Sequence, residues 1–263
     1  MERLSEHFAD APSTFTTSPL YRELCATVAD DRSILELLVE CRHGQQPSFL
    51  LFGAVHYLLL SGADHPLRNF YPSLVGAAAA EPSAAGPFLK DFCARYRDEL
   101  LDIVRTRLVQ TNVVKRVFGL TFALTAIGAR CDEPVHLVEV GASAGIHLLF
   151  DRYRYEIGGR TFGRRDASVT VETEWRGPTE PPDLDDVPAI ASRIGVDLDP
   201  VDVTVDDERL WLRALVWPED RRKAELLEAA LEVVASDPPT MVKGDAIDVC
   251  PALGRSLPPG PRV

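Results

Sequence analysis

Seven residues between positions 139 and 145 have the types and spacing of a ligand-binding turn. They read Glu-Val-Gly-Ala-Ser-Ala-Gly, so Glu139, Gly141, Ser143 and Gly145 alternate with apolar residues. Glycines let a backbone approach a ligand closely, and a helix that begins after them offers N–H groups and a partial positive charge to a carboxylate or phosphate. The expected chemistry is recognition of a nucleotide-type ligand.

The same residues allow a second interpretation. Gly141, Ser143 and Gly145 have the G-x-S-x-G spacing that resembles the nucleophile elbow of α/β-hydrolases, in which Ser143 would attack an acyl carbon. His147 is the only histidine beyond the turn, and a base four residues along the same helix is not where such a triad places it. A hydrolase is therefore the weaker alternative.

A strand must precede this turn and a helix must follow it. Residues 135–140 form a short, β-branched run of strand length, and a helix is predicted from residue 146 to 153. A further strand is predicted at residues 240–243, followed by Gly244-Asp245-Ala246. Ligands of open α/β sheets bind outside the carboxyl ends of the strands, so both strand ends are candidate binding positions.

The rest of the chain divides into two predicted regions. Residues 1–130 read as helical, with the longest helix at 86–109, and residues 131–263 read as α/β. Elements predicted in the second region are a hairpin at Gly158-Gly159, a strand at 168–175, an acidic loop at 177–188, a short helix at 190–194, a strand at 201–205 and helices at 208–216 and 219–235.

Polar groups near the turn also allow more than one interpretation. Gln110-Thr111-Asn112 precedes an apolar run, and Asn112 either caps a helix or reaches into the ligand crevice. His147 and Asp151 stand four residues apart, so they line the crevice, form a local pair, or belong to a polar helix face.

Residues 139–145 resemble motif I of class I S-adenosylmethionine-dependent methyltransferases, which reads E/D-x-G-x-G-x-G; Ser143 stands where the middle glycine is usual. Gly244-Asp245-Ala246 resembles the strand-end sequence of those enzymes whose aspartate faces adenine. The resemblance implies a Rossmann-like, methyltransferase-type α/β sheet preceded by an all-helical region, with S-adenosylmethionine as cofactor. The residues implied at its amino-acid end are Glu139, Gly141, Ala142, Ser143 and Gly145, and Asp245 is implied at the adenine end.

The resemblance leaves the ribose and the catalytic residue open. Such folds hold the ribose hydroxyls with an acidic residue at the end of the second strand, and Glu156 and Glu172 are the two candidates. Residues 257–263 read as a loop that enters a new strand, so we expect a sheet that is incomplete at residue 263, where the catalytic segment would begin. A Rossmann-like scaffold that binds something else, or performs no chemistry, is the main alternative function.

The longer segment from residue 139 to 155 also resembles an uncharacterised bacterial family of unknown function, which pairs a helical N-terminal region with this glycine turn. That resemblance supplies no mechanism.

The charge and the cysteine content limit the classes of binding partner and the compartment that we expect. The 263-residue chain carries 28 Lys and Arg against 40 Asp and Glu, a formal charge of −12, so nucleic acid is not an expected partner. The five cysteines stand at long spacings without a CxxC pair, which predicts a reducing compartment and no zinc site. Without a signal segment or an apolar run of about 20 residues, the expected location is the cytoplasm.

Overall fold

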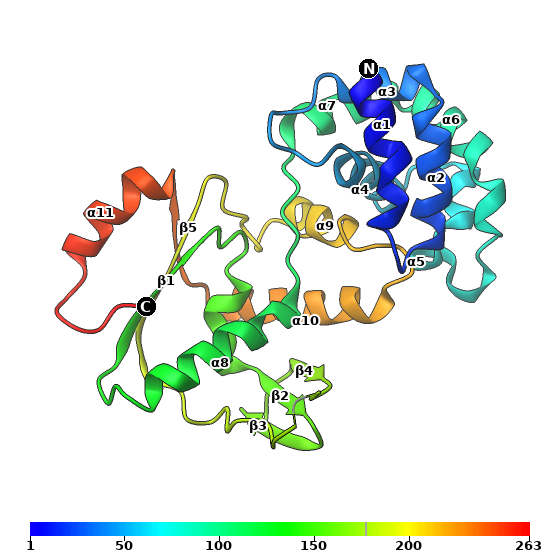
Figure 1. Cartoon of the computed structure of the whole chain (residues 1–263). Coiled ribbons are helices and arrows are strands. Elements are labelled where there is room, and N and C mark those ends of the chain that lie inside the picture. Colours follow the sequence, from blue (N-terminus) through cyan, green and yellow to red (C-terminus); the bar gives the residue numbers. More distant parts are fainter. Residues whose placement is uncertain (177) are drawn as a thin grey trace. The chain divides into compact units, whose positions relative to one another are not determined.

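The computed structural model describes residues 1–176 and 178–263; residue 177, the first of the predicted acidic loop, lies outside the described residues. The chain forms two compact units (Figure 1). The first comprises Met1–Thr111 and Leu210–Ala224, and the second comprises Asn112–Arg209 and Glu225–Val263. The described residues of the first unit form helices and turns, and both sheets belong to the second. The protein is therefore mixed α/β with N-terminal helices, as the sequence predicts.

The first unit is built from short helices, and several of them begin at a polar residue or a proline. They are α1 (Glu2–Asp10), α2 (Pro19–Ala29), α3 (Arg32–Leu38), α4 (Pro47–Leu60), α5 (Pro72–Val75), α6 (Gly86–Arg95) and α7 (Arg97–Thr106). The end of α9 (Asp206–Ala214) and the start of α10 (Arg221–Ser236) also belong to this unit. The Ser18 side chain accepts from the N–H of Tyr21 and Pro19 follows it, so an N-cap hydroxyl and a proline begin α2.

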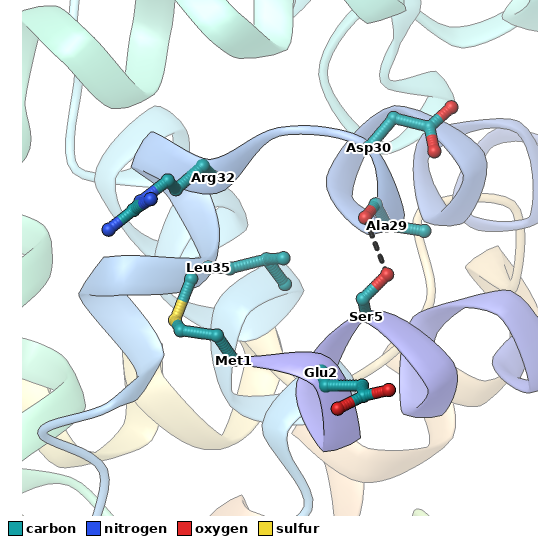
Figure 2. Close-up of a pocket in the computed structure, with 7 residues that line it drawn as sticks. All are labelled: Met1, Glu2, Ser5, Ala29, Asp30, Arg32 and Leu35. Carbon is teal, nitrogen blue, oxygen red and sulfur yellow. Dashed lines mark hydrogen bonds between the residues drawn. The ribbon is translucent and has the colours of Figure 1, made fainter.

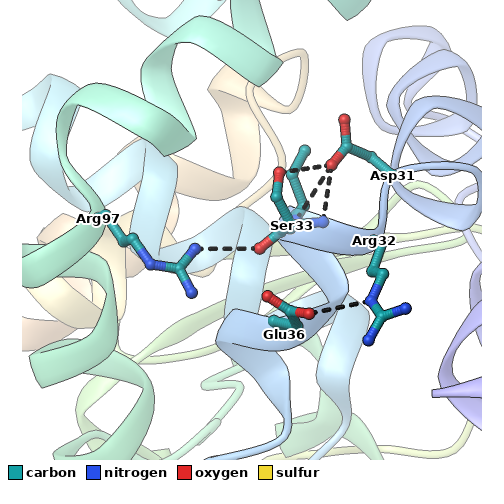
Figure 3. Close-up of polar contacts among 6 residues, drawn as sticks. Asp31, Arg32, Ser33, Glu36 and Arg97 are labelled. Carbon is teal, nitrogen blue, oxygen red and sulfur yellow. Dashed lines mark hydrogen bonds and ion pairs between the residues drawn. The ribbon is translucent and has the colours of Figure 1, made fainter.

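The start of α3 shows the same device in detail (Figure 3). The Asp31 carboxylate accepts from the N–H groups of Ser33 and Ile34, at 3.0 and 3.2 Å. Its other oxygen lies 3.1 Å from the Lys90 ammonium, which the figure does not draw. Partial burial opposes ionisation of Asp31, but hydrogen bonds from the Ser33 hydroxyl, Lys90 and the Ile34 N–H outweigh it and lower the pKa of Asp31. The carboxylate therefore caps the helix in its charged form.

One helix prediction for this unit is wrong. The predicted helix at 86–109 is two ten-residue helices, α6 and α7, which meet at Tyr96. Tyr96 leaves helical geometry (φ −106°, ψ 32°), its ring packs 4.6 Å from the Phe92 ring, and its hydroxyl donates to the carbonyl of Asp64 at 3.3 Å. Tertiary contacts of one side chain thus interrupt a continuous helical pattern.

The core of the first unit contains a buried histidine on α4. Nδ1 of His56 lies 3.0 Å from the carbonyl oxygen of Ala214, which can only accept, so Nδ1 carries a proton. Nε2 then accepts from the hydroxyl of Ser73 at 2.8 Å. Burial lowers the pKa of His56 to about 4, so the ring is neutral near pH 7.

The second unit is organised around a small parallel sheet. Its strands are β1 (Val135–Val140), β5 (Ile190–Asp197) and β6 (Thr240–Lys243), in the order β1-β5-β6. Residues 261–263 run parallel along the other edge of β1: the N–H of His136 donates to Pro261, that of Val138 to Val263, and that of Val263 to His136. The chain thus leaves β1 on one side and returns to it on the other.

Two predictions about this sheet are wrong. Residues 190–194, predicted as a helix, form the first part of the central strand β5, because hydrogen bonding to β1 and β6 overrides a weak local pattern. Residues 201–205, predicted as a strand, form a turn in which the Asp202 carboxylate accepts from the N–H of Thr204 at 2.9 Å. Asx turns of this kind compete with strand pairing.

A second sheet and the remaining helices complete this unit. Strands β2 (Arg154–Ile157), β3 (Arg160–Gly163) and β4 (Thr170–Thr173) pair in the order β3-β2-β4. The predicted Gly158-Gly159 hairpin is confirmed, with φ of +57° and +79°. The helices are α8 (Val117–Gly128) and α11 (Ala246–Ser256), together with the start of α9 and most of α10. Every described helix is too short or too polar to cross a lipid bilayer.

Candidate ligand-binding site

The predicted glycine turn directly follows β1. Gly141, Ser143 and Gly145 have φ of +75°, +51° and +72°, and the N–H groups of Gly141 and Gly145 donate to the carbonyls of Val196 and Ala142 at 2.8 and 2.7 Å. Ser143 is the single non-glycine residue with positive φ in the described part of the chain. Such a conformation costs a serine roughly 1 kcal/mol and persists only where the surroundings hold it.

The helix predicted after the turn is shorter and tighter than expected. Residues Ile146–Arg152 form the 3-10 helix η6, and Leu149 inside it departs from helical geometry (φ −100°, ψ 24°). The turn therefore offers individual backbone and side-chain groups to a ligand, and not the dipole of a regular α-helix.

The two glycines of the turn have different roles. A Cβ added to Gly145 would lie 2.7 Å from Cγ of Pro239, so this glycine is needed for internal packing. A Cβ added to Gly141 would meet no atom within 4 Å, and Gly141 is exposed. The space above Gly141 is open to an approaching ligand.

Asp197, at the end of β5, links the turn to β6. Its Oδ2 accepts from the N–H of Ser143 at 2.8 Å, its Oδ1 accepts from the N–H of Asp199 at 2.9 Å, and its carbonyl accepts from the N–H of Gly244 at 2.9 Å. Asp197 is not among the predicted site residues, because residues 190–194 are predicted as a helix and not as a strand that ends beside the turn. The available signal was an apolar segment, 194–196, that ends in an acidic residue.

Asp245 follows β6 and caps α11. Its carboxylate accepts from the N–H of Ile247 at 2.8 Å, and the residue is exposed. Because β1, β5 and β6 are parallel and Val140 and Asp197 stand in register with Val196 and Lys243, the ends of all three strands lie at one edge of the sheet. The turn, Asp197 and Asp245 therefore share the carboxyl edge.

Large apolar side chains are exposed along this edge. Val140 is 61% exposed, Leu198 is 65% exposed and Ile247 is 82% exposed. They stand at or just after the ends of β1, β5 and β6, respectively. Exposed apolar side chains grouped with polar groups at a sheet edge are typical of a surface that takes a ligand with an apolar face.

Glu139 is paired with His147. Oε1 of Glu139 lies 3.0 Å from Nδ1 of His147, and Nε2 of His147 donates to the carbonyl of Val113 at 3.1 Å. Burial alone would lower the pKa of His147, but the hydrogen bonds and charge of Glu139 and the Val113 carbonyl outweigh it and raise the pKa. The buried Oε2 of Glu139 accepts no hydrogen bond from the described residues.

Two predicted alternatives for the polar groups are resolved by these contacts. Asn112 reaches the turn: its Nδ2 donates to Oγ of Ser143 at 3.0 Å, whereas Val113 and not Asn112 caps the following 3-10 turn. His147 pairs with Glu139 rather than with Asp151, which forms an ion pair with Arg193.

Glu156 and Glu172, the predicted ribose-binding candidates, lie elsewhere. They stand opposite each other on β2 and β4 of the second sheet, and they line a cavity of about 300 Å³ at the hairpin. Glu156 also lies 2.7 Å from Arg154. Neither residue is at the carboxyl edge of the parallel sheet, because both belong to strands outside it.

A second cavity, of about 340 Å³, lies in the helical unit between the start of α1, the end of α2 and α3 (Figure 2). Its wall includes the Met1 and Leu35 side chains, and the Ser5 hydroxyl donates to the carbonyl of Ala29 at 2.8 Å. The Ser5 hydroxyl is thus used in holding α1 to α2, and Glu2, Asp30 and Arg32 are charged residues of the same wall. Among the described residues, no group of three His, Cys, Asp or Glu side chains is arranged to hold a metal ion.

These observations define a mixed α/β protein with a small parallel sheet and a glycine turn at its carboxyl edge. The chain belongs to the bacterial family described as "Uncharacterized protein conserved in bacteria (DUF2332)", which matches it over residues 3–263. No curated protein and no solved structure matched the chain. Membership confirms the resemblance to an uncharacterised bacterial family, and function is therefore argued from the site.

Proposed function

We propose that the chain binds S-adenosylmethionine at the carboxyl edge of the parallel sheet and transfers its methyl group to an acceptor. The observation that carries this proposal is the position of Asp197, which bonds to the glycine turn through its side chain and to Gly244 through its carbonyl. Asp197 thus bonds both to Ser143 in the turn after β1 and to Gly244, the residue between β6 and Asp245.

The strand order supports the same proposal. From β1 the sheet extends through β5 to β6, and the chain then returns to the opposite edge of β1 at residues 261–263. Open α/β sheets bind ligands where the strand order reverses in this way, outside the carboxyl ends of the strands. The reversal falls beside β1, and β1 ends in the glycine turn.

The residues present fit the chemical groups of the cofactor. The buried Oε2 of Glu139 lacks a donor among the described residues, and the cofactor's ammonium group is a donor. The Asp197 carboxylate is an acceptor of the kind that ribose hydroxyls require. Leu198 and Ile247 offer apolar surface, and the exposed Asp245 offers an acceptor, to the adenine ring.

The cofactor's sulfonium group supplies an activated methyl group, and the task left to the protein is to align that methyl group with a nucleophile. Gly141 allows the close approach of the cofactor, and the contacts of Ser143 hold the turn in place. Asp197 would replace Glu156 and Glu172 as the ribose-binding residue.

The hydrolase interpretation gains no support from the site. Both ring nitrogens of His147 are occupied, by Glu139 and by the Val113 carbonyl, and Ser143 Oγ accepts from Asn112. A general base must lie within hydrogen-bond reach of its nucleophile. His147 therefore has the wrong partners to activate Ser143.

Isothermal titration with S-adenosylhomocysteine tests the proposal. We expect the intact chain to bind it and Asp197→Asn to bind it at least tenfold more weakly, because a charged acceptor for the ribose is lost. Asp166→Asn, which removes an exposed carboxylate paired with Arg164, is the matched control and should bind normally. A folded wild-type chain that gives no heat of binding contradicts the proposal.

A further inference from the structure

The Ser143 hydroxyl is held from one side, and this contact fixes the direction of its proton. Asn112 Nδ2 lies 3.0 Å from Ser143 Oγ. An amide nitrogen can only donate, so the serine oxygen accepts and its O–H points away from Asn112. The amide therefore orients a hydroxyl that would otherwise rotate freely.

The backbone of Ser143 is equally constrained. Its N–H donates to Asp197, and its carbonyl accepts from the N–H of Val201 at 3.1 Å. These two contacts hold the residue at φ +51°, a conformation that serine rarely adopts. The hydroxyl proton is the group of Ser143 that these contacts leave available to a ligand, and a proton donor suits a ligand acceptor.

We propose that Asn112 is a positioning residue: it aims the Ser143 hydroxyl proton at an anionic group of the ligand. This inference rests on the proposed function, and in S-adenosylmethionine the anionic group is the carboxylate of the amino-acid end. Glu139 and Ser143 then divide that end between them, Glu139 taking the ammonium group and Ser143 the carboxylate. Asn112 lies before β1, outside the glycine turn that it serves.

A pair of ligands separates this role from a general structural one. S-adenosylhomocysteine carries the carboxylate, and 5′-methylthioadenosine has the same adenosine and thioether but no amino-acid end. Hydrogen bonds to charged groups are worth about tenfold to a hundredfold in affinity. We expect Ser143→Ala and Asn112→Ala each to weaken binding of S-adenosylhomocysteine, the former by about tenfold, and to leave binding of 5′-methylthioadenosine within about twofold of wild type.

The double variant tests whether the two residues act as a unit. If Asn112 works through the hydroxyl, Asn112→Ala adds nothing in the Ser143→Ala background. Additive losses, or equal losses for the two ligands, would overturn the proposal, because Asn112 would then be acting on the whole turn.

A charge change gives a second, independent test. Asn112→Asp keeps the size of the side chain but can only accept, so the Ser143 proton turns toward it and a negative charge faces the ligand carboxylate. We expect a loss of at least tenfold for S-adenosylhomocysteine alone. Asn69→Asp, on an exposed residue of the helical unit, is the control and should change neither affinity. Unchanged binding in Asn112→Asp overturns the inference while leaving the proposed function standing; a wild-type chain that binds neither ligand overturns both.

Discussion

Each polar side chain of the site is held by hydrogen bonds to residues that its own type does not predict. Glu139 and Asn112 could be singled out from the sequence, but their partners, His147 and Ser143, come from the folded chain. Asp197 has three backbone partners that lie up to 54 residues away in sequence. Residue type and spacing therefore predict the glycine turn. That Asp197 lies beside the turn follows only from the register of β5 against β1 and β6.

The Glu139–His147 pair gives a pH prediction. Glu139 raises the pKa of His147, so the pair's stabilising contribution is complete below about pH 6.5 and is lost as the pH rises through the raised pKa. In Glu139→Gln the burial remains while the favourable charge is gone, and we expect the His147 pKa to fall below its ordinary value. NMR titration of the His147 ring measures its pKa in the wild type and in Glu139→Gln. Glu156→Gln is the control and should leave the His147 pKa unchanged. An unchanged pKa in Glu139→Gln would refute the pairing.

His56 predicts the opposite dependence. Its folded pKa is about 4 because it is buried, and the unfolded value is about 6.5, so the unfolded chain binds a proton first as the pH falls. The free energy of unfolding should decline between pH 6.5 and 4 by about 3 kcal/mol on account of this residue. Urea unfolding across that range should show a shallower decline in His56→Gln, and identical pH slopes would argue against a buried neutral ring.

At the scale of elements, prediction succeeded where the local pattern was strong. The β-branched run of β1, the strand β6 and the Gly158-Gly159 hairpin are present as predicted. β5 was mistaken for a helix because its first residues, Ile-Ala-Ser-Arg, lack clear alternation, and its pairing with two neighbours determines its conformation. That error hid Asp197 and moved the ribose prediction to a different sheet.

Close packing of β5 against its surroundings predicts the effect of one substitution. A Cβ on Gly195 would lie 2.6 Å from Sδ of Met241 and 2.8 Å from Cβ of Ala142. Met241 is flexible but Ala142 is not, so Gly195→Ala should lower the free energy of unfolding by about 1–3 kcal/mol. Gly254→Ala, in α11 with no atom within 4 Å, should be neutral or stabilising. Equal stability of the two variants in urea would contradict this packing.

At the scale of the whole molecule, each compact unit takes residues from both halves of the sequence. The segment Leu210–Ala224 belongs to the helical unit although it follows β1 and β5 in the chain. The family match likewise extends over residues 3–263. Binding experiments therefore belong on the full chain, because a cut between the two sequence halves would remove residues from both units.

The most direct measurement compares two glycines by calorimetry with S-adenosylhomocysteine. Gly141 and Gly159 have nearly equal φ, +75° and +79°, and a Cβ on either meets no atom within 4 Å. Alanine at each position should therefore lower stability similarly, by about 1 kcal/mol. Only Gly141 belongs to the proposed site.

Wild type and Gly159→Ala should bind the ligand and gain about 2.7 kcal/mol of stability at 100 times its dissociation constant. Gly141→Ala should lose at least tenfold in affinity, because its methyl group enters the space that the ligand would fill. Equal binding by the two alanine variants, or no binding by the wild-type chain, would contradict a cofactor site at the glycine turn.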